Sequence, residues 1–203
     1  MAFDHMIRSR AATAFTLIEL LVVTAIMLIL VSMASLGLAQ VMEGARMTQA
    51  GRSIVDEINL ARQIAATRNV NVELRFMEQT RAGTNVFCGL QSGVRNKAGD
   101  GTFVPVTRLT LLPDGVALAP QASLSSLIGS LTKSTATNPA YRYVAVIIRP
   151  SGSLEPASGL SLNQPWFVTA VPETKLGVDI AALKNFVTVQ IDPWTARPTA
   201  YRP

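Results

Sequence analysis

The residue whose chemistry stands out is Glu19, a single carboxylate at the start of a long apolar run. From Leu20 to Met42 the chain has 23 residues and no charged side chain. As an α-helix this run would measure about 35 Å, enough to cross a hydrocarbon core of about 30 Å. A carboxylate in lipid costs about 3 kcal/mol on insertion scales. A plain membrane anchor has no use for such a group, so Glu19 needs a separate explanation.

The other reactive side chains offer no enzyme site. The one histidine is His5, so removal of residues 1–14 would exclude Ser-His-Asp and Cys-His nucleophiles and histidine-based zinc sites. The one cysteine, Cys88, cannot form an intrachain disulfide, and we expect a small buried side chain. Asp114 and Asp179 are single carboxylates beside turn or helix-start residues. No nucleotide-binding glycine loop, HExxH or CxxC pattern occurs, so the sequence predicts no catalytic residues, metal ligands or cofactor.

Composition sets broad limits on the protein class. The chain has 203 residues and is 49% hydrophobic, with most of the apolar excess before residue 43. The remainder of the chain has the ordinary composition of one globular domain. The net charge of +5 is not clustered into a patch that would bind a polyanion. Of the aromatic residues, Trp166, Phe167 and Trp194 are expected in the core.

The N-terminal segment allows more than one interpretation. Arg8 and Arg10 favour a cytoplasmic N-terminus, with the chain after the apolar run on the other side of the membrane. A cleaved secretory signal would use the small residues at Gly37-Leu38-Ala39, but its apolar core is normally only about 7–15 residues long. A simple signal anchor is the second alternative. Neither of them explains Glu19.

A third interpretation comes from a resemblance. The stretch Phe-Thr-Leu-Ile-Glu-Leu-Leu-Val-Val, from Phe15 to Val23, resembles the N-terminal methylation motif of the type IV pilin and pseudopilin superfamily. The resemblance implies that a prepilin peptidase cleaves between Ala14 and Phe15 on the cytoplasmic side, and that Phe15 is then N-methylated. The family most often has glycine before the cleavage site, where this chain has Ala14.

The resemblance also supplies a role for Glu19. Cleavage would create a new α-amine at Phe15, and Glu19 lies four residues further on, about 6 Å along the helix axis. In a filament of staggered helices, the amine of one subunit can meet Glu19 of a neighbour, which neutralises two charges that are costly in lipid. Glu19 could also simply reach the lipid headgroups. The implied partners are other pilin or pseudopilin subunits, the prepilin peptidase and an inner-membrane assembly platform.

The helix is predicted to continue beyond the apolar run, because no proline occurs before Pro105. Its second half is two-faced: apolar positions alternate at helical spacing with polar ones. The apolar face holds Gly51, Ile54, Ile58, Ala61 and Ala65, and the polar face holds Arg52, Asp56, Asn59 and Gln63. The whole helix, from Phe15 to about Arg68, would be about 80 Å long.

Three glycines, Gly37, Gly44 and Gly51, are seven residues apart in this helix and lie on nearly one face. Glycine allows close helix approach but costs about 1 kcal/mol against alanine in a helix. The spacing therefore leaves two interpretations open, a packing surface or tolerated weak points.

The pattern changes to short strands after Asn69. Strict alternation predicts a first strand, proline- and glycine-containing turns separate the later ones, and a loop with a short helix is expected within 120–140. Because no regular helices separate the strands, the sheet should be mainly antiparallel, with Pro105 on an edge strand. The predicted strands are Val70–Phe76, a short one near Val86–Leu90 within loops of 78–101, Thr102–Leu112, Tyr141–Arg149, Trp166–Val171 and Phe186–Ile191, and Val178–Leu183 is a weak helix candidate.

Within the superfamily, the chain is most similar to the minor pseudopilin group of general secretion pathway protein H and FimT. The similarity lies in Leu60–Asn69, in Ile147–Gly152 and around Thr195–Arg197, and region 78–140 shows none. A further similarity is to pseudopilin-like proteins encoded in Verrucomicrobial gene cassettes. Some relatives bind DNA through a basic C-terminal tail, and the candidate residues here are Arg197 and Arg202. Two arginines beside prolines are more often part of a solvated tail. Nucleic acid is therefore not the expected partner.

The predicted fold is α+β and pilin-like, with a long N-terminal helix on a mainly antiparallel, β-rich head, which the resemblance implies is made of two small sheets. The expected parts are a cleaved basic leader (1–14), a transmembrane half-helix (15–42), an amphipathic half-helix (43–68) and a periplasmic head (69–203). The expected protein is a minor subunit of a type II secretion or type IV pilus-like filament, single-pass in the inner membrane before assembly. The alternative is a membrane-tethered binding module that does not polymerise and that recognises a protein or DNA.

Overall fold

A computed structural model describes residues 15–95, 102–137, 140–156 and 160–203. The chain divides into two compact units, residues 1–41 and residues 42–203. Within the described residues, no helix combines the length and the mean hydropathy required of a membrane span. The first half of the predicted long helix lies in the first unit, and its second half, with every strand, lies in the second.

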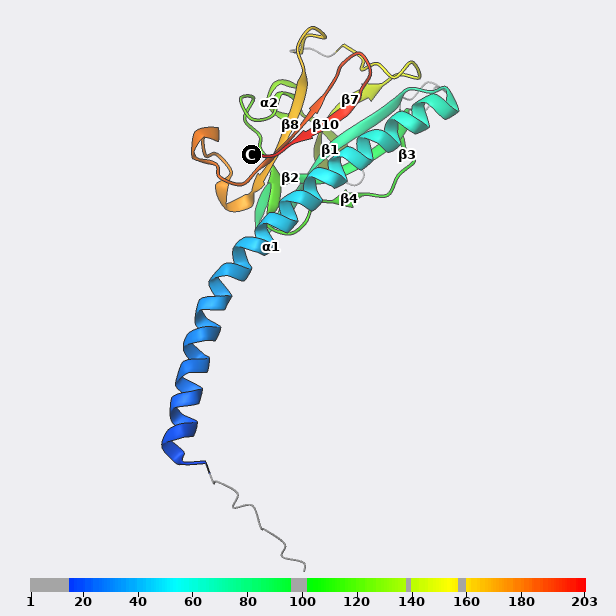
Figure 1. The fold of residues 1–203 in the computed structure, drawn as a ribbon. Helices are drawn as coiled ribbons and strands as arrows, with labels where there is room; N and C mark the ends of the chain where they lie inside the picture. The colour runs from blue at the N-terminus through cyan, green and yellow to red at the C-terminus, as the bar shows by residue number, and fades with distance from the viewer. Residues whose placement is uncertain (1–14, 96–101, 138–139, 157–159) are drawn as a thin grey trace, which may run out of the picture. The chain divides into compact units, whose positions relative to one another are not determined.

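The long helix α1 covers Leu17–Arg68, 52 residues (Figure 1). Thr16 caps its start, because the Glu19 backbone N–H donates to Thr16 Oγ1 at 3.2 Å. The helix ends where Asn69 takes a left-handed conformation with φ of 50°. The Val70 N–H then donates to the Ala65 carbonyl at 3.2 Å, the six-to-one bond of a Schellman ending. The predicted end near Arg68 is therefore confirmed.

The second half of α1 buries the apolar face that the sequence predicted. Ile54, Ile58, Ala61 and Ala65 are fully buried, and Met47 and Ala50 extend the same face. On the opposite face, the predicted polar residues are exposed, apart from half-buried Asn59. The apolar face packs on the core of the head, together with buried side chains of the sheet.

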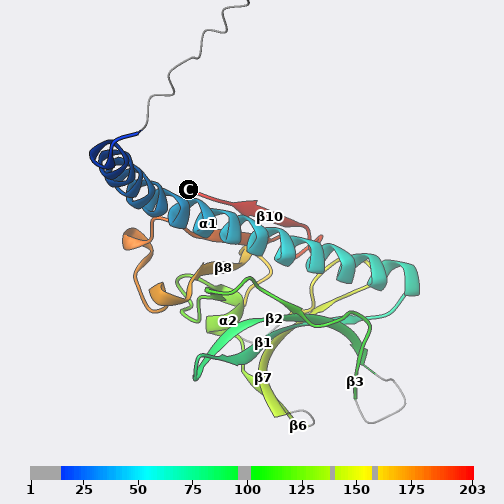
Figure 2. The same ribbon diagram turned by 90° about the horizontal axis from the view of Figure 1, so that it is seen from below.

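Within the described residues the head is built from ten strands joined into a sheet of order β10-β9-β8-β5-β2-β1-β7-β6, in which β3 and β4 also pair with β2 (Figure 2). Every strand pairing is antiparallel, as predicted. The strands are β1 (Val72–Arg81), β2 (Thr84–Arg95), β3 (Phe103–Pro105), β4 (Thr110–Leu111), β5 (Val116–Leu118), β6 (Ser134–Thr137), β7 (Ala140–Ile148), β8 (Trp166–Pro172), β9 (Val187–Ile191) and β10 (Pro198–Tyr201).

The expectation of two separate small sheets is corrected. β5 joins the two halves, since it pairs with β8 over Val116–Leu118 and with β2 through the one pair Phe87↔Leu118. The halves are thus distinct groups of strands with a narrow hydrogen-bonded connection. The short strand β5 carried no alternation long enough to predict it from sequence.

The region 78–101 is the largest departure from the sequence interpretation. Instead of loops around a short strand, its described part completes a long hairpin of β1 and β2. Ala82 and Gly83 both have positive φ, 47° and 80°, which is the two-residue turn that suits a hairpin. An Ala-Gly turn lacks the asparagine or aspartate that usually marks this geometry, so the sequence did not predict the hairpin. Residues 96–101 lie outside the described part.

The remaining predictions were partly right. The strands predicted from Tyr141, Trp166 and Phe186 are β7, β8 and β9, and the short helix within 120–140 is α2 (Ser126–Ser130). The predicted strand Thr102–Leu112 is interrupted, because the Val106 and Thr107 N–H groups both donate to the Ser92 carbonyl, and only β3 and β4 remain. Pro105 ends β3, which pairs only with β2 and so is an edge strand. Val178–Leu183 contains only the 3-10 turn Ile180–Ala182, after the turn Glu173–Lys175.

Candidate functional site

Glu19 lies in the first turn of α1 with its carboxylate exposed. Its backbone N–H donates a hydrogen bond to Thr16 Oγ1. Its carboxylate has no hydrogen bond or ion pair among the described residues. Thr16 and Glu19 have the spacing of a capping box, in which the acid would bond back to the N-cap amide. Only the threonine half of that box is formed. Among the described residues, Glu19 is therefore a carboxylate without a side-chain partner at the start of an apolar helix.

The surface around Glu19 is apolar on every side of the helix. Leu17 is 90% exposed, and Phe15 and Ile18 are each more than 70% exposed. Large exposed apolar surfaces of this kind mark contact with lipid or with other protein. The exposed large side chains of this segment are Phe15, Leu17, Ile18, Leu20, Leu21, Val22, Val23, Ile26, Met27, Leu28, Ile29, Leu30 and Val31.

The predicted cleavage site is only partly described. Phe15 is the first described residue and precedes the helix, whereas Ala14 lies outside the described residues. Cleavage at this bond and methylation of Phe15 stay predictions. A chain end at Phe15 would lie one residue before the Thr16 cap and four residues from Glu19.

Comparison with known proteins bears on this segment. Residues 9–35 match the family described as the prokaryotic N-terminal methylation motif. The chain carries the N-terminal motif of pilin-like proteins. The match spans Ala14, Phe15 and Glu19, so the three residues that the sequence singled out lie within one recognised motif. The match covers only this part of the chain and does not extend into the head.

Among solved structures, the chain is similar to one described as the minor pseudopilin EpsH from the Type 2 Secretion System of Vibrio cholerae. The two are 11% identical, the similarity covers 78% of this chain and 96% of that chain, and the TM-score is 0.43. No curated protein matches the sequence significantly. Inferences about function therefore rest on the motif and on the residues of this chain.

The two C-terminal arginines occupy different environments. Residues 198–201 form β10, which lies beside α1 (Figure 2). Arg202 donates to Thr48 Oγ1 at 2.5 Å and to Asn185 Oδ1 at 3.1 Å, so it fastens the C-terminus to α1. Arg197 is exposed. Residues 198–201 thus form a strand whose side chains are mostly exposed, and DNA binding by either arginine stays a prediction.

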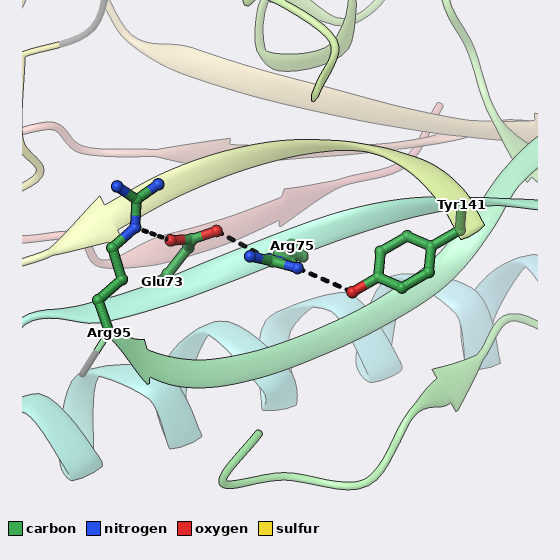
Figure 3. A network of polar contacts seen from close by, with 4 residues as sticks. All are labelled: Glu73, Arg75, Arg95 and Tyr141. Carbon is green, nitrogen blue, oxygen red and sulfur yellow. Dashed lines mark hydrogen bonds and ion pairs between the residues drawn. The ribbon is translucent and has the colours of Figure 1, made fainter. Parts of the chain in front are cut away.

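A buried ionic network, which the sequence did not predict, lies on the other face of the sheet (Figure 3). Glu73, on β1, is 1% exposed and accepts from Arg75 Nε at 2.7 Å and from Arg95 Nε at 2.5 Å. Arg75 Nη1 donates to the hydroxyl of Tyr141 at 2.8 Å. The hydrogen bond from Arg95 to Glu73 raises the pKa of that guanidinium further. The alternation predicted the first strand, but it could not show that Glu73 and Arg75 would be covered.

Aromatic rings cover Arg75 from both sides. Its guanidinium carbon lies 3.6 Å from the ring centre of Phe103 and 3.9 Å from that of Tyr143. Stacked cations of this kind gain electrostatic energy from the ring faces. Because these partners come from β1, β2, β3 and β7, the network fixes the short edge strand β3 to the sheet. We assign it a structural role.

A second buried carboxylate fixes α1 to the head. Glu57 is 5% exposed and accepts hydrogen bonds from Ser92 Oγ at 2.6 Å and from Thr107 Oγ1 at 2.8 Å.

Cys88 is fully buried, and burial raises the pKa of its thiol. Among the described residues, no group of three or more histidine, cysteine or acidic side chains could hold a metal ion.

Proposed function

We propose that this chain is a minor pilin or pseudopilin subunit that enters a type II secretion or type IV pilus-like filament through its N-terminal helix. The observation that best supports this proposal is the methylation motif on residues 9–35, in which Glu19 has no partner among the described residues. The proposed role is structural and not enzymatic. Its proposed partners are other subunits, a prepilin peptidase and an inner-membrane assembly platform.

In this proposal, processing creates a positively charged partner for Glu19. In the proposed pathway, cleavage after Ala14 frees the amine of Phe15, which keeps its positive charge when methylated. Within one helix the amine and Glu19 are about 6 Å apart along the axis, so an axial stagger of that size places the amine of one subunit beside Glu19 of the next. An ion pair in a medium of low dielectric constant is far less costly than two separate charges. The pairing therefore favours assembled over separate subunits.

The exposed apolar segment gives the proposed location. Before assembly, the side chains from Phe15 onward would lie in the inner membrane, with Arg8 and Arg10 keeping the leader cytoplasmic and the head periplasmic. After assembly, the same side chains would be covered by neighbouring helices. Both environments remove the apolar surface from water, at about 25 cal/mol per Å².

The test is the mass of the N-terminus of the full chain purified from cells that express a prepilin peptidase. We expect the first residue to be Phe15, with one added methyl group on its amine. An intact Met1 would favour the tethered binding module. A first residue shortly after Ala39 would instead indicate an ordinary secretory signal, and either result would end the proposal.

A further inference from the structure

Trp194 is the unexplained feature of the head. The sequence placed it in the core, but it is 61% exposed, whereas Trp166 is fully buried. The residues around it explain the difference, because the chain turns at Pro193 and directs the next side chain outward. An exposed indole gives up much of the stability that burying it would supply.

The turn that carries Trp194 is held from several directions. Asp192 accepts from the Trp194 backbone N–H at 2.9 Å and from Thr195 Oγ1 at 2.8 Å. The Leu154 N–H donates to the Pro193 carbonyl at 2.7 Å, and Arg62 Nε donates to the Thr195 carbonyl at 3.0 Å. The first two hydrogen bonds also lower the pKa of Asp192. The exposed ring is thus presented by a preorganised backbone.

A shallow depression of about 390 Å³ lies beside this ring. Three amide side chains line it, from Asn163, Gln164 and Gln190, and none of them has a side-chain hydrogen bond within the described part of the chain. Each amide offers two donors and one acceptor. Asp192 is the one charged residue of the lining, and both of its oxygens are used by the turn.

We propose that this depression binds a neutral carbohydrate. The C–H face of a sugar ring is weakly positive and packs on the negative face of an indole, while hydroxyl groups donate and accept as amides do. An anionic ligand would find no cation in the lining. A purely apolar ligand would leave the three amides without hydrogen bonds, which costs binding energy. No residue of α1 lines the depression, and the proposal does not depend on the proposed function.

The experiment uses the full chain in a zwitterionic detergent without a sugar headgroup, titrated calorimetrically with cellotetraose and with chitotetraose. We expect saturable binding of at least one probe, with a blue shift of the exposed Trp194 fluorescence. Trp194→Ala should abolish detectable binding, and Gln190→Ala should weaken it about fivefold, the effect of one neutral hydrogen bond. Comparing the two probes shows whether the site favours acetamido or simple hydroxyl substituents.

Tyr201→Ala is the matched control, because Tyr201 is an exposed aromatic residue, 54% exposed, on β10 and outside the depression. It should bind like the wild type, and thermal unfolding checks that each variant is folded. If neither probe binds the wild-type chain, or if Trp194→Ala and Tyr201→Ala bind equally well, the proposal is wrong. It is also wrong if Trp194→Ala alters only incorporation into filaments, since the ring would then be a protein contact.

Discussion

At the scale of single residues, three glutamates show how the chain treats carboxylates. Glu73 is buried between two arginines, and Glu57 is buried between two hydroxyl groups. Both accept hydrogen bonds inside the head, because a buried acceptor left without a partner costs about 1–3 kcal/mol. Glu19 alone of the three has no internal partner among the described residues. This contrast supports the proposal that its partner belongs to another subunit.

The assembly role of Glu19 can be tested by substitution. Glu19→Ala should leave the chain in the membrane but lower its incorporation into filaments about a hundredfold, because an ion pair of about 3 kcal/mol is lost. Incorporation is measured by the amount of the chain in sheared or purified filaments. Asp56→Ala, which removes an exposed carboxylate from the same helix, is the control and should assemble normally. Wild-type incorporation of Glu19→Ala would contradict the pairing.

At the scale of elements, α1 and the C-terminal strands are in close contact at two glycines. A Cβ added at Gly51 would lie 2.7 Å from Val187 Cγ1, so β9 approaches the helix where only glycine fits. A Cβ at Gly44 would lie 3.2 Å from Nη2 of Arg202, the far end of a flexible side chain. Of the two interpretations of the glycine spacing, the packing surface therefore applies to Gly51. The surface that packs on it is β9 of the same chain and not a neighbouring helix. The side-chain surroundings of Gly37 lie outside the described residues.

The two glycines give a matched pair of substitutions. Gly51→Ala should lower the free energy of unfolding by about 1 kcal/mol, because overpacking of about 2 kcal/mol exceeds the gain in helix propensity of about 1 kcal/mol. Gly44→Ala gains the same propensity while Arg202 can move, so we expect it to be neutral or stabilising. Urea unfolding of the full chain in detergent, followed by tryptophan fluorescence, measures both. Equal effects of the two substitutions would argue against the close contact at Gly51.

At the scale of the whole molecule, residues 42–203 form a compact unit with its own core, and Cys88 reports on its integrity. The thiol is fully buried on β2. Its pKa is raised mainly by burial, while Arg81 lowers it by a smaller amount. At a given pH, a raised pKa leaves less thiolate, the reactive form, than a free cysteine has. Both burial and protonation therefore protect Cys88 while the unit is folded.

We expect alkylation of Cys88 by iodoacetamide at pH 8 to be about a hundredfold or more slower in the folded chain than in urea. Mass spectrometry of the modified chain gives both rates. Raising the pH should continue to speed the folded reaction above the ordinary cysteine pKa of about 8.5, because the thiolate is still increasing there. Ser151→Cys places a second thiol on an exposed turn and should react rapidly in the same sample. Rapid labelling of native Cys88 would show that the core is open.

The sequence by itself determined the features that depend on neighbours along the chain. The motif at Phe15–Val23, the end of α1 near Arg68, its apolar face and the alternation of the first strand all follow from spacing within a few residues. Helical and strand periods are local properties, so they can be read without the fold. Hairpin partners joined by an Ala-Gly turn were the exception, because that turn has little sequence signature.

Only the tertiary structure decided which side chains of the head are covered. Arg75 and Tyr141 are 66 positions apart, and Arg202 and Thr48 are 154 apart, yet each pair shares a hydrogen bond. Trp194 is exposed and Glu73 is buried, the reverse of what their residue types suggest. Burial depends on which distant segments the chain brings together, and local patterns of polarity do not carry that information.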